Sequence, residues 1–329
     1  MQIAFLGTGA IGASLVRALY LNKIPFTILV RDKKRKLDLL TRGISYRLKD
    51  ITHVELAGDE VRTVGEAKKY DYIFMGMKTP NLRASAATAK KHLTKNGKII
   101  LLQNGLPEGA ITGYKSEQII SGIVGYNTQL MNDGSYFQSN PGHLILGVTA
   151  PTVLAEELKT ALEPHQPVLL THNPVGFRWN KLAINSVING LGAVTGLALG
   201  PLFARRDARR AAITLIQEAA AVMKALRIEE GIVPGAISVY KLAGFPKFLQ
   251  HLIIYILGRK YAKIRTSMLQ DIDKGVKTEV DEIHGAIVAA AKTVGIAVPL
   301  TSQIVARVHA LETGKTKPNV DALQSFFGR

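Results

Sequence analysis

A glycine-rich turn lies between an apolar, strand-like run at residues 3–6 and a helical pattern at 13–19. The turn reads Gly7-Thr8-Gly9-Ala10-Ile11-Gly12. In such a turn the first glycine permits a tight bend, the second lets the backbone approach a pyrophosphate, and the third allows helix and strand to pack closely. Amides at the helix N-terminus would then face the phosphates. The turn therefore predicts dinucleotide binding; the alternative is a glycine turn that serves packing alone.

Short apolar runs alternate with segments of helical period over the first half of the chain. These runs are Ile3–Leu6, Phe26–Val30, Tyr72–Met77, Ile99–Leu102 and Ile119–Val124. Alternation of this kind indicates a parallel sheet with crossover helices. The turn-rich stretch between Gly134 and Val148 predicts antiparallel strands that close the domain, and Pro167–Leu170 predicts its last strand. We therefore expect an α/β fold with a Rossmann-type, doubly wound parallel sheet.

From about Val175 onward the periodicity is helical, and no strong strand candidate remains. Asn173-Pro174 is a turn signal, so we expect a dinucleotide-binding domain over 1–172 and an all-helical substrate and catalytic domain over 173–329. The less periodic region 227–263 contains the apolar run Phe248–Leu257, about half of the roughly 20 residues that cross a bilayer. We expect this run to form a buried or interface helix without stable membrane insertion.

Composition excludes several classes of site. The chain has no cysteine, which rules out disulfides, thiolate metal sites and cysteine nucleophiles. Its eight histidines lack the short spacings that place two imidazoles on one metal, so we expect no metal site. A net charge of +17 favours anionic partners, but without a reading motif we expect no nucleic acid among them. No basic n-region precedes the first strand, so we expect a cytoplasmic protein.

The residues after the second predicted strand bear on the choice of dinucleotide. They read Arg31-Asp32-Lys33-Lys34-Arg35-Lys36. A carboxylate here would accept hydrogen bonds from the ribose of NAD, whereas an arginine would pair with the 2′-phosphate of NADP. Because Arg31 comes first and more cations follow, the sequence favours NADP. The alternatives are that Asp32 accepts from the ribose, or that the basic run is a solvated loop.

Three polar residues share one face of the first helix predicted in the second domain. Lys181, Asn185 and Asn189 stand four residues apart, which places them within about 80 degrees of each other on a helix. Asparagine is a poor helix former, and a polar group among apolar neighbours needs a partner. The amides could satisfy backbone groups where the domains meet. The functional alternative is hydride transfer to a carbonyl, which needs a proton donor near the oxygen, and a lysine flanked by amide donors meets that need.

Together these motifs resemble the ketopantoate reductase (2-dehydropantoate 2-reductase) family over nearly the whole chain. The shared motifs are Gly7–Gly12, Lys78 after the strand 72–77, the Leu-Gln-Asn-Gly of 102–105, residues 179–189, the Ser-Met-Leu-Gln-Asp of 267–271 and the Thr-Glu-Val-Asp of 278–281. The resemblance implies an NADPH-dependent reduction of ketopantoate to pantoate in pantothenate synthesis, by hydride transfer to C2 of the oxo acid.

The resemblance also implies catalytic and substrate-binding roles for five residues. Lys181 matches the family's general acid, and Asn185 and Asn189 match the amides that orient the substrate. Ser267 matches the serine that binds the substrate carboxylate. Glu279 matches the glutamate beside the lysine and the cofactor, where a carboxylate could orient the ammonium group.

Three more residues match the family's cofactor site. Lys78 and Asn104 correspond to residues that line the cofactor cleft, and we also place Asn104 among the substrate-binding residues. Arg31 corresponds to the reader of the 2′-phosphate. The resemblance thus implies a small-molecule 2-oxo acid as substrate and NADPH as cofactor.

The chain departs from the family pattern at three places, and these leave other functions open. Residues 227–265 are longer and more apolar than in compact members, Gly190 stands where a proline is common, and Ile264 where a polar amide is common. We expect these changes to touch the pocket rather than the chemistry, so a paralogue that reduces another 2-oxo acid is the main alternative. A non-catalytic dinucleotide sensor or nucleic-acid-associated protein has only the charge in its favour. The apolar helices after Arg227 could supply a homodimer interface.

Overall fold

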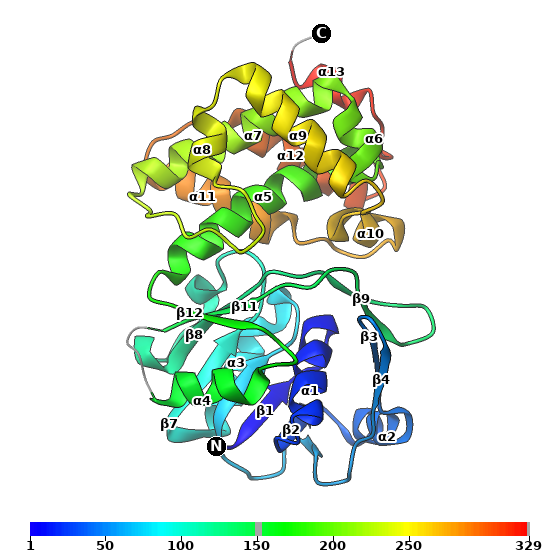
Figure 1. The fold of residues 1–329 in the computed structure, drawn as a ribbon, viewed down its shortest axis with the longest axis vertical. Coiled ribbons are helices and arrows are strands. Elements are labelled where there is room, and N and C mark those ends of the chain that lie inside the picture. Colours follow the sequence, from blue (N-terminus) through cyan, green and yellow to red (C-terminus); the bar gives the residue numbers. More distant parts are fainter. Residues whose placement is uncertain (149–152, 328–329) are drawn as a thin grey trace. The chain divides into compact units, whose positions relative to one another are not determined.

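The computed structural model describes residues 1–148 and 153–327, which form two compact units. The first unit comprises Met1–Pro174 with the short piece Val233–Gly235. The second comprises Val175–Ile232 and Ala236–Arg329. Figure 1 shows strands in the first of these parts and helices in the second.

An eight-stranded sheet forms the centre of the first unit. Its members are β1 (Ile3–Leu6), β2 (Phe26–Val30), β5 (Val61–Thr63), β6 (Tyr70–Met75), β7 (Leu93–Leu101), β8 (Ile119–Val124), β11 (Leu144–Gly147) and β12 (Val168–Thr171). The order is β12-β11-β8-β7-β6-β1-β2-β5, and every neighbouring pair is parallel except β8 with β11. This topology confirms the predicted Rossmann-type sheet, including the antiparallel strand that closes it.

Helices cover both faces of this sheet because successive strand residues point to opposite sides. Ile3 and Phe5 of β1 pack with α1 (Ala10–Leu21), α2 (Lys33–Arg42) and α4 (Val153–Leu162). Ala4 and Leu6 pack on the other face, with α3 (Leu82–Lys91). Burial on both sides explains why these strands are almost continuously apolar. Short 3₁₀ turns complete the unit: η1 (Thr79–Asn81), η2 (Pro107–Ala110) and η3 (Ser116–Gln118).

A second, smaller sheet was not predicted from the sequence. Its order is β4 (Ile51–Val54), β3 (Ile44–Arg47), β10 (Tyr136–Gln138) and β9 (Thr128–Leu130). β3 pairs parallel with β10, and the two outer pairs are antiparallel. The turn-rich stretch from Gly134 therefore supplies strands to both sheets: β10 to the small one and β11 to the large one.

The second unit is helical throughout its described residues, as expected. Its elements are α5 (Pro174–Thr195), α6 (Leu199–Ala204), α7 (Arg206–Ala225), α8 (Val239–Gly244), α9 (Lys247–Lys260), α10 (Ser267–Asp273), the π turn η4 (Asp281–Gly285), α11 (Ala286–Thr293), α12 (Pro299–Glu312) and α13 (Ala322–Ser325). α7 packs against most of the others, and the buried Glu218 on it accepts hydrogen bonds from the backbone amides of Leu300 and Thr301 at 2.8 Å each. Glu218 thereby caps the N-terminus of α12.

The apolar run Phe248–Leu257 lies in α9 and is not fully buried. Gln250 and Ile254 face the interior, but Phe248 is 73% exposed and Ile256 is 53% exposed. The expectation of a buried helix is therefore wrong for one face of α9, and an interface helix stays a prediction. Within residues 1–148 and 153–327, no helix combines the length and the apolar character that spanning a membrane requires.

Candidate active site

The glycine turn after β1, called the glycine cradle below, lies so close to the backbone after β6 that larger residues would clash. Gly7 has φ +83°, in the left-handed region that favours glycine. A Cβ atom at Gly9 would lie 2.8 Å from the carbonyl oxygen of Gly76, and one at Gly76 would lie 2.2 Å from that of Gly7. Gly12 is buried, and its Cβ would lie 3.1 Å from the same Gly7 oxygen. The backbone segments after β1 and β6 thus approach so closely that only glycine fits.

The rest of the predicted turn is held by a tyrosine side chain and by the start of α1. The carbonyl oxygen of Thr8 accepts a hydrogen bond from the Tyr136 hydroxyl at 2.8 Å. Ala10 and Ile11 open α1, whose N-cap residue Gly9 provides no side-chain cap. Amides in the first turn of a helix lack intrahelical partners, so an uncapped N-terminus suits an anionic phosphate.

The other predicted cofactor residues follow strands that end at the same edge of the sheet. β1, β2, β6 and β7 are parallel, so the turn, Arg31, Lys78 and Asn104 all come after carboxyl ends. Ligands of doubly wound sheets bind outside such ends. The buried Gln103 joins two of these segments, because its Nε2 donates to the carbonyl oxygens of Met75 and Met77 at 2.8 Å each.

Arg31 projects into solvent, whereas Asp32 is engaged in local structure. The Arg31 side chain is 93% exposed and lies 3.6 Å from Asp32. One oxygen of Asp32 caps α2 by accepting a hydrogen bond from the Arg35 amide at 2.8 Å. Arg35 forms an ion pair with Asp38 at 2.5 Å, and Lys36 forms one with Glu66 at 3.5 Å. Arg31 is therefore more accessible to a phosphate than Asp32 is to a ribose.

In the second unit, α5 carries Lys181, Asn185 and Asn189 on one continuous helix. Lys181 and Asn185 are partly exposed, and Asn189 is buried. The hydroxyl of Ser267, the exposed first residue of α10, donates to Asn189 Oδ1 at 3.2 Å. The structure thus brings together two predicted substrate-binding residues that are far apart in the sequence.

Lys181 has an unusual electrostatic environment for a lysine. Its pKa is lowered to about 8, chiefly by burial and also by the charge of Arg178, one turn earlier on α5. Glu279 opposes both effects and raises the pKa of Lys181, so these two predicted catalytic residues interact. A cationic acid whose pKa lies near neutral pH is well suited to donate a proton.

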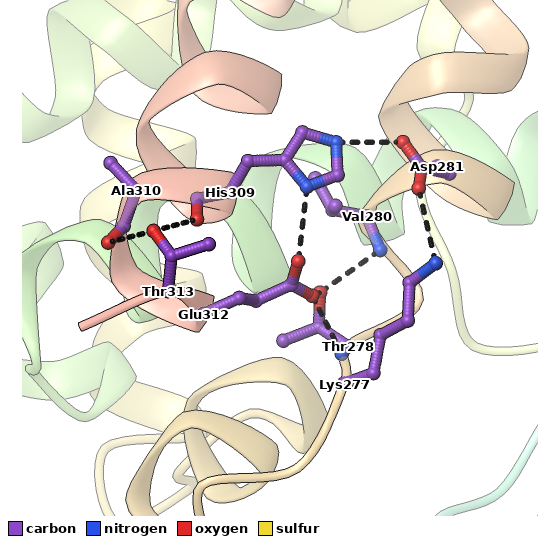
Figure 2. Close-up of polar contacts among 8 residues, drawn as sticks. All are labelled: Lys277, Thr278, Val280, Asp281, His309, Ala310, Glu312 and Thr313. Carbon is purple, nitrogen blue, oxygen red and sulfur yellow. Dashed lines mark hydrogen bonds and ion pairs between the residues drawn. The ribbon is translucent and has the colours of Figure 1, made fainter. Parts of the chain in front are cut away.

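The segment that carries Glu279 is fixed on both sides. Before it, the amide and hydroxyl of Thr278 donate to Glu312 at 2.7 Å each (Figure 2). After it, the π turn η4 brings the buried His284 against α5, where Nε2 donates to the Ser186 carbonyl at 2.7 Å. Burial lowers the pKa of His284 to about 4, so this imidazole is neutral at physiological pH.

The structure explains the glycine at position 190. A Cβ atom there would lie 2.4 Å from His284 Nε2 and 2.8 Å from the Ile304 side chain. Gly190 is buried on α5 against these residues, so its contacts are packing contacts, and the expectation that this departure touches a substrate pocket stays a prediction.

Several residues that fix the site were not singled out from the sequence. The signal for Gly76 is its place directly after a buried strand. Gln103 lies in the Leu-Gln-Asn-Gly motif of 102–105, in which the sequence assigned a role to Asn104 alone. Asn180 neighbours Lys181, and its Nδ2 donates to Glu230 and to the Ile237 carbonyl at 2.9 Å each, which anchors α5. No local pattern marks the distant partners of such contacts.

A doubly wound sheet with a glycine cradle, joined to a helical unit that presents a lysine of lowered pKa, has the architecture of an oxidoreductase. Two family models match the chain: "Ketopantoate reductase PanE/ApbA" over residues 3–151 and "Ketopantoate reductase PanE/ApbA C terminal" over residues 175–312. The chain therefore belongs to the ketopantoate reductase family.

Individual relatives agree with this membership. A 2-dehydropantoate 2-reductase of Archaeoglobus fulgidus is 25% identical over 95% of this chain and 98% of its own length. A ketopantoate reductase structure from Ralstonia eutropha has a TM-score of 0.80 at 20% identity, covering 96% of this chain and 99% of its own. A D-mandelate dehydrogenase structure with NADH and anilino(oxo)acetate has a TM-score of 0.79 at 20% identity, covering 95% and 99%. At these identities the two structures establish the shared fold.

Proposed function

We propose that this protein is an NADPH-dependent 2-dehydropantoate 2-reductase, which reduces ketopantoate to pantoate in cytoplasmic pantothenate biosynthesis. The observation that carries the proposal is the environment of Lys181: a pKa lowered to about 8, an interaction with Glu279, and a helix face shared with Asn189, which is bonded to Ser267. Membership of the family agrees with it.

The glycine cradle suits a dinucleotide, because it leads into the N-terminus of α1, which no side chain caps, and amides there can bind a pyrophosphate. We assign the pyrophosphate to the Gly7–Gly12 turn and the 2′-phosphate to the exposed Arg31. Lys78 and Asn104 would line the same edge of the sheet. When bound, the reduced nicotinamide supplies the hydride.

Four polar side chains are assigned to the oxo acid. Ser267 would bind its carboxylate, and Asn185, Asn189 and Asn104 would orient it. Asn189 Oδ1 accepts from Ser267 before the oxo acid binds; the single hydroxyl hydrogen of Ser267 would then turn to the substrate carboxylate, and the Nδ2 group of Asn189 would donate to a substrate oxygen.

Lys181 supplies the proton that the reduction needs. As hydride reaches C2 of the oxo acid, the Lys181 ammonium donates a proton to the developing alkoxide, which becomes the hydroxyl of the product. The neutral amine then recovers its proton from solvent. Glu279 keeps the ammonium form populated, because a nearby carboxylate favours the charged lysine.

Consumption of NADPH by the purified protein on addition of ketopantoate tests the proposal, with NADH as the comparison cofactor. We expect turnover with ketopantoate and a lower Michaelis constant for NADPH than for NADH. No oxidation of either cofactor would refute the proposed activity, and a clear preference for NADH would refute the assignment of Arg31.

A second candidate is a reductase of another 2-oxo acid. It is favoured by the fold shared with D-mandelate dehydrogenase and by Ile264, where family members commonly have an amide. A panel of aliphatic and aromatic 2-oxo acids separates the two candidates: a kcat/KM for an aromatic or bulkier acid above that for ketopantoate would select the second.

A further inference from the structure

The C-terminal end of α12 contacts the chain on both sides of Glu279. Before Glu279, Thr278 donates its amide and its hydroxyl to Glu312 Oε1, at 2.7 Å each. After Glu279, Asp281 Oδ1 lies 2.9 Å from His309 Nε2. His309 Nδ1 lies 3.0 Å from Glu312 Oε2, which closes the connection, as Figure 2 shows. His309 and Glu312 thus link the two ends of a four-residue segment with Glu279 inside it.

The geometry defines the protonation state in which this link is complete. Both ring nitrogens of His309 face carboxylate oxygens, and an ionised carboxylate can only accept hydrogen bonds. A neutral imidazole has a single N–H, so the two contacts are both hydrogen bonds only in the imidazolium form.

The charges around His309 favour that form. Glu312 faces it from α12 and Asp281 from the preceding segment, while Lys277 lies 3.8 Å from the other oxygen of Asp281. The hydrogen bond with Glu312 is the largest cause of a raised pKa of His309; desolvation opposes it, and Asp281 adds to it. Burial acts to raise the pKa of Glu312, but bonds from Thr278 and His309 outweigh it and leave that pKa lowered.

We propose that His309 is a positioning residue for Glu279: as an imidazolium it joins Asp281 to Glu312, and Glu312 in turn holds Thr278. This inference rests on the roles proposed above for Lys181 and Glu279. The contact is complete at pH values below the ordinary histidine pKa. It loses one hydrogen bond as the pH rises through the raised pKa of the folded protein.

The consequence for the site follows from the interaction of Glu279 with Lys181. Glu279 raises the pKa of Lys181. If the segment 278–281 loses its contact with His309, Glu279 is held less firmly near Lys181, and the pKa of Lys181 should fall below about 8. General loosening of the unit would lower activity without moving this titration in a fixed direction. The pKa of Lys181 therefore distinguishes positioning from a purely structural role.

The test measures the Lys181 titration by NMR of lysine side chains in the whole protein, with its resonance identified by loss in Lys181→Ala. In His309→Leu we expect the pKa of Lys181 to fall by several tenths of a unit to about one unit. The alkaline limb of kcat/KM should shift by the same amount, with kcat reduced about tenfold and the KM for the oxo acid little changed.

Two further variants control the experiment. Thr313→Val removes a hydroxyl whose hydrogen bonds among the described residues go to the carbonyls of His309 and Ala310, within one helix turn, and should leave the titration unchanged. His309→Arg keeps a cation that can donate to both carboxylates, and should hold the pKa of Lys181 closer to the wild-type value than the leucine variant does.

An unchanged pKa of Lys181 in folded His309→Leu would overturn the inference. If that variant does not fold, Asp281→Ala serves instead, because it removes the acceptor of His309 Nε2 and leaves the bonds from Thr278 to Glu312 in place; an unchanged titration there has the same meaning. If the protein reduces no oxo acid, the proposed function fails, and the NMR titration still decides the role of His309.

Discussion

Lys181 titrates below an ordinary lysine because burial removes water from its ammonium group and Arg178 repels it. A general acid must be protonated when substrate binds, so activity depends on the ammonium fraction. We expect kcat/KM for the oxo acid to be constant below about pH 7 and to fall as the pH rises through about 8, the pKa of Lys181 in the free protein. A pH profile of NADPH oxidation measures this. An alkaline limb near the ordinary lysine value of 10.5 would show that Lys181 is not the titrating acid.

Gly190 has no room for a side chain. In Gly190→Ala the added Cβ would press on His284 Nε2 and break its bond to the Ser186 carbonyl. We expect the free energy of unfolding to fall by about 1–3 kcal/mol, because overpacking and an unpaired buried polar group both destabilise. Denaturant unfolding measures the change. Gly244→Ala, in α8 with open space around it, is the matched control and should be neutral or slightly stabilising. Equal effects of both substitutions would contradict the packing role of Gly190.

At this scale the sequence predicted some residues and could not predict others. Lys181, Asn185 and Asn189 were found because helical spacing is a local property. His309 and Glu312 could not be found, because their contact with Thr278 and Asp281 joins segments about thirty residues apart and has no local pattern. The roles assigned to the predicted site residues stay predictions until they are measured.

At the scale of elements, α12 depends on a cap from another helix. The carboxylate of Glu218 accepts from two backbone amides and from the Thr301 hydroxyl at 2.6 Å, in the interior. In Glu218→Ala these donors lose their partner, so we expect a loss of about 2 kcal/mol or more in the free energy of unfolding. Glu218→Gln keeps one carbonyl oxygen and should lose less. Thermal unfolding of both variants measures this. If Glu218→Gln lost as much free energy of unfolding as Glu218→Ala, the capping role of Glu218 would be contradicted.

Fully buried apolar strands were predicted well, whereas strands of mixed burial, and the first part of β7 (Leu93–Leu101), were not. β1, β2 and β8 begin and end where the periodicity indicated, because both faces of each are buried. β6 ends at Met75 rather than at residue 77, since Gly76 turns against Gly7. The strands of the small sheet have three or four residues, so even where burial alternates, as in β3 and β10, the alternation is too short for a sequence pattern to detect.

At the scale of the whole molecule, the sequence predicted the α/β fold and the family, and both are confirmed. These predictions depended on the order of the motifs along the chain: a strand, a glycine turn and a helix come first, and a helical half with Lys181 and two asparagines follows. The choice of NADPH, the identity of the oxo acid, the cytoplasmic location and a homodimer stay predictions. Each depends on a partner that the sequence pattern does not specify.

The measurement that most directly tests the account is the turnover of Lys181→Ala beside the wild-type protein, at one pH near neutrality. NADPH oxidation with saturating ketopantoate should fall about 10²-fold or more, because the proton donor is lost, while NADPH binding followed by fluorescence should persist. Lys292→Ala, an exposed lysine at the end of α11, serves as the control and should keep wild-type turnover. Turnover of Lys181→Ala within a few-fold of wild type would contradict the account, since the reaction would then have another source of protons.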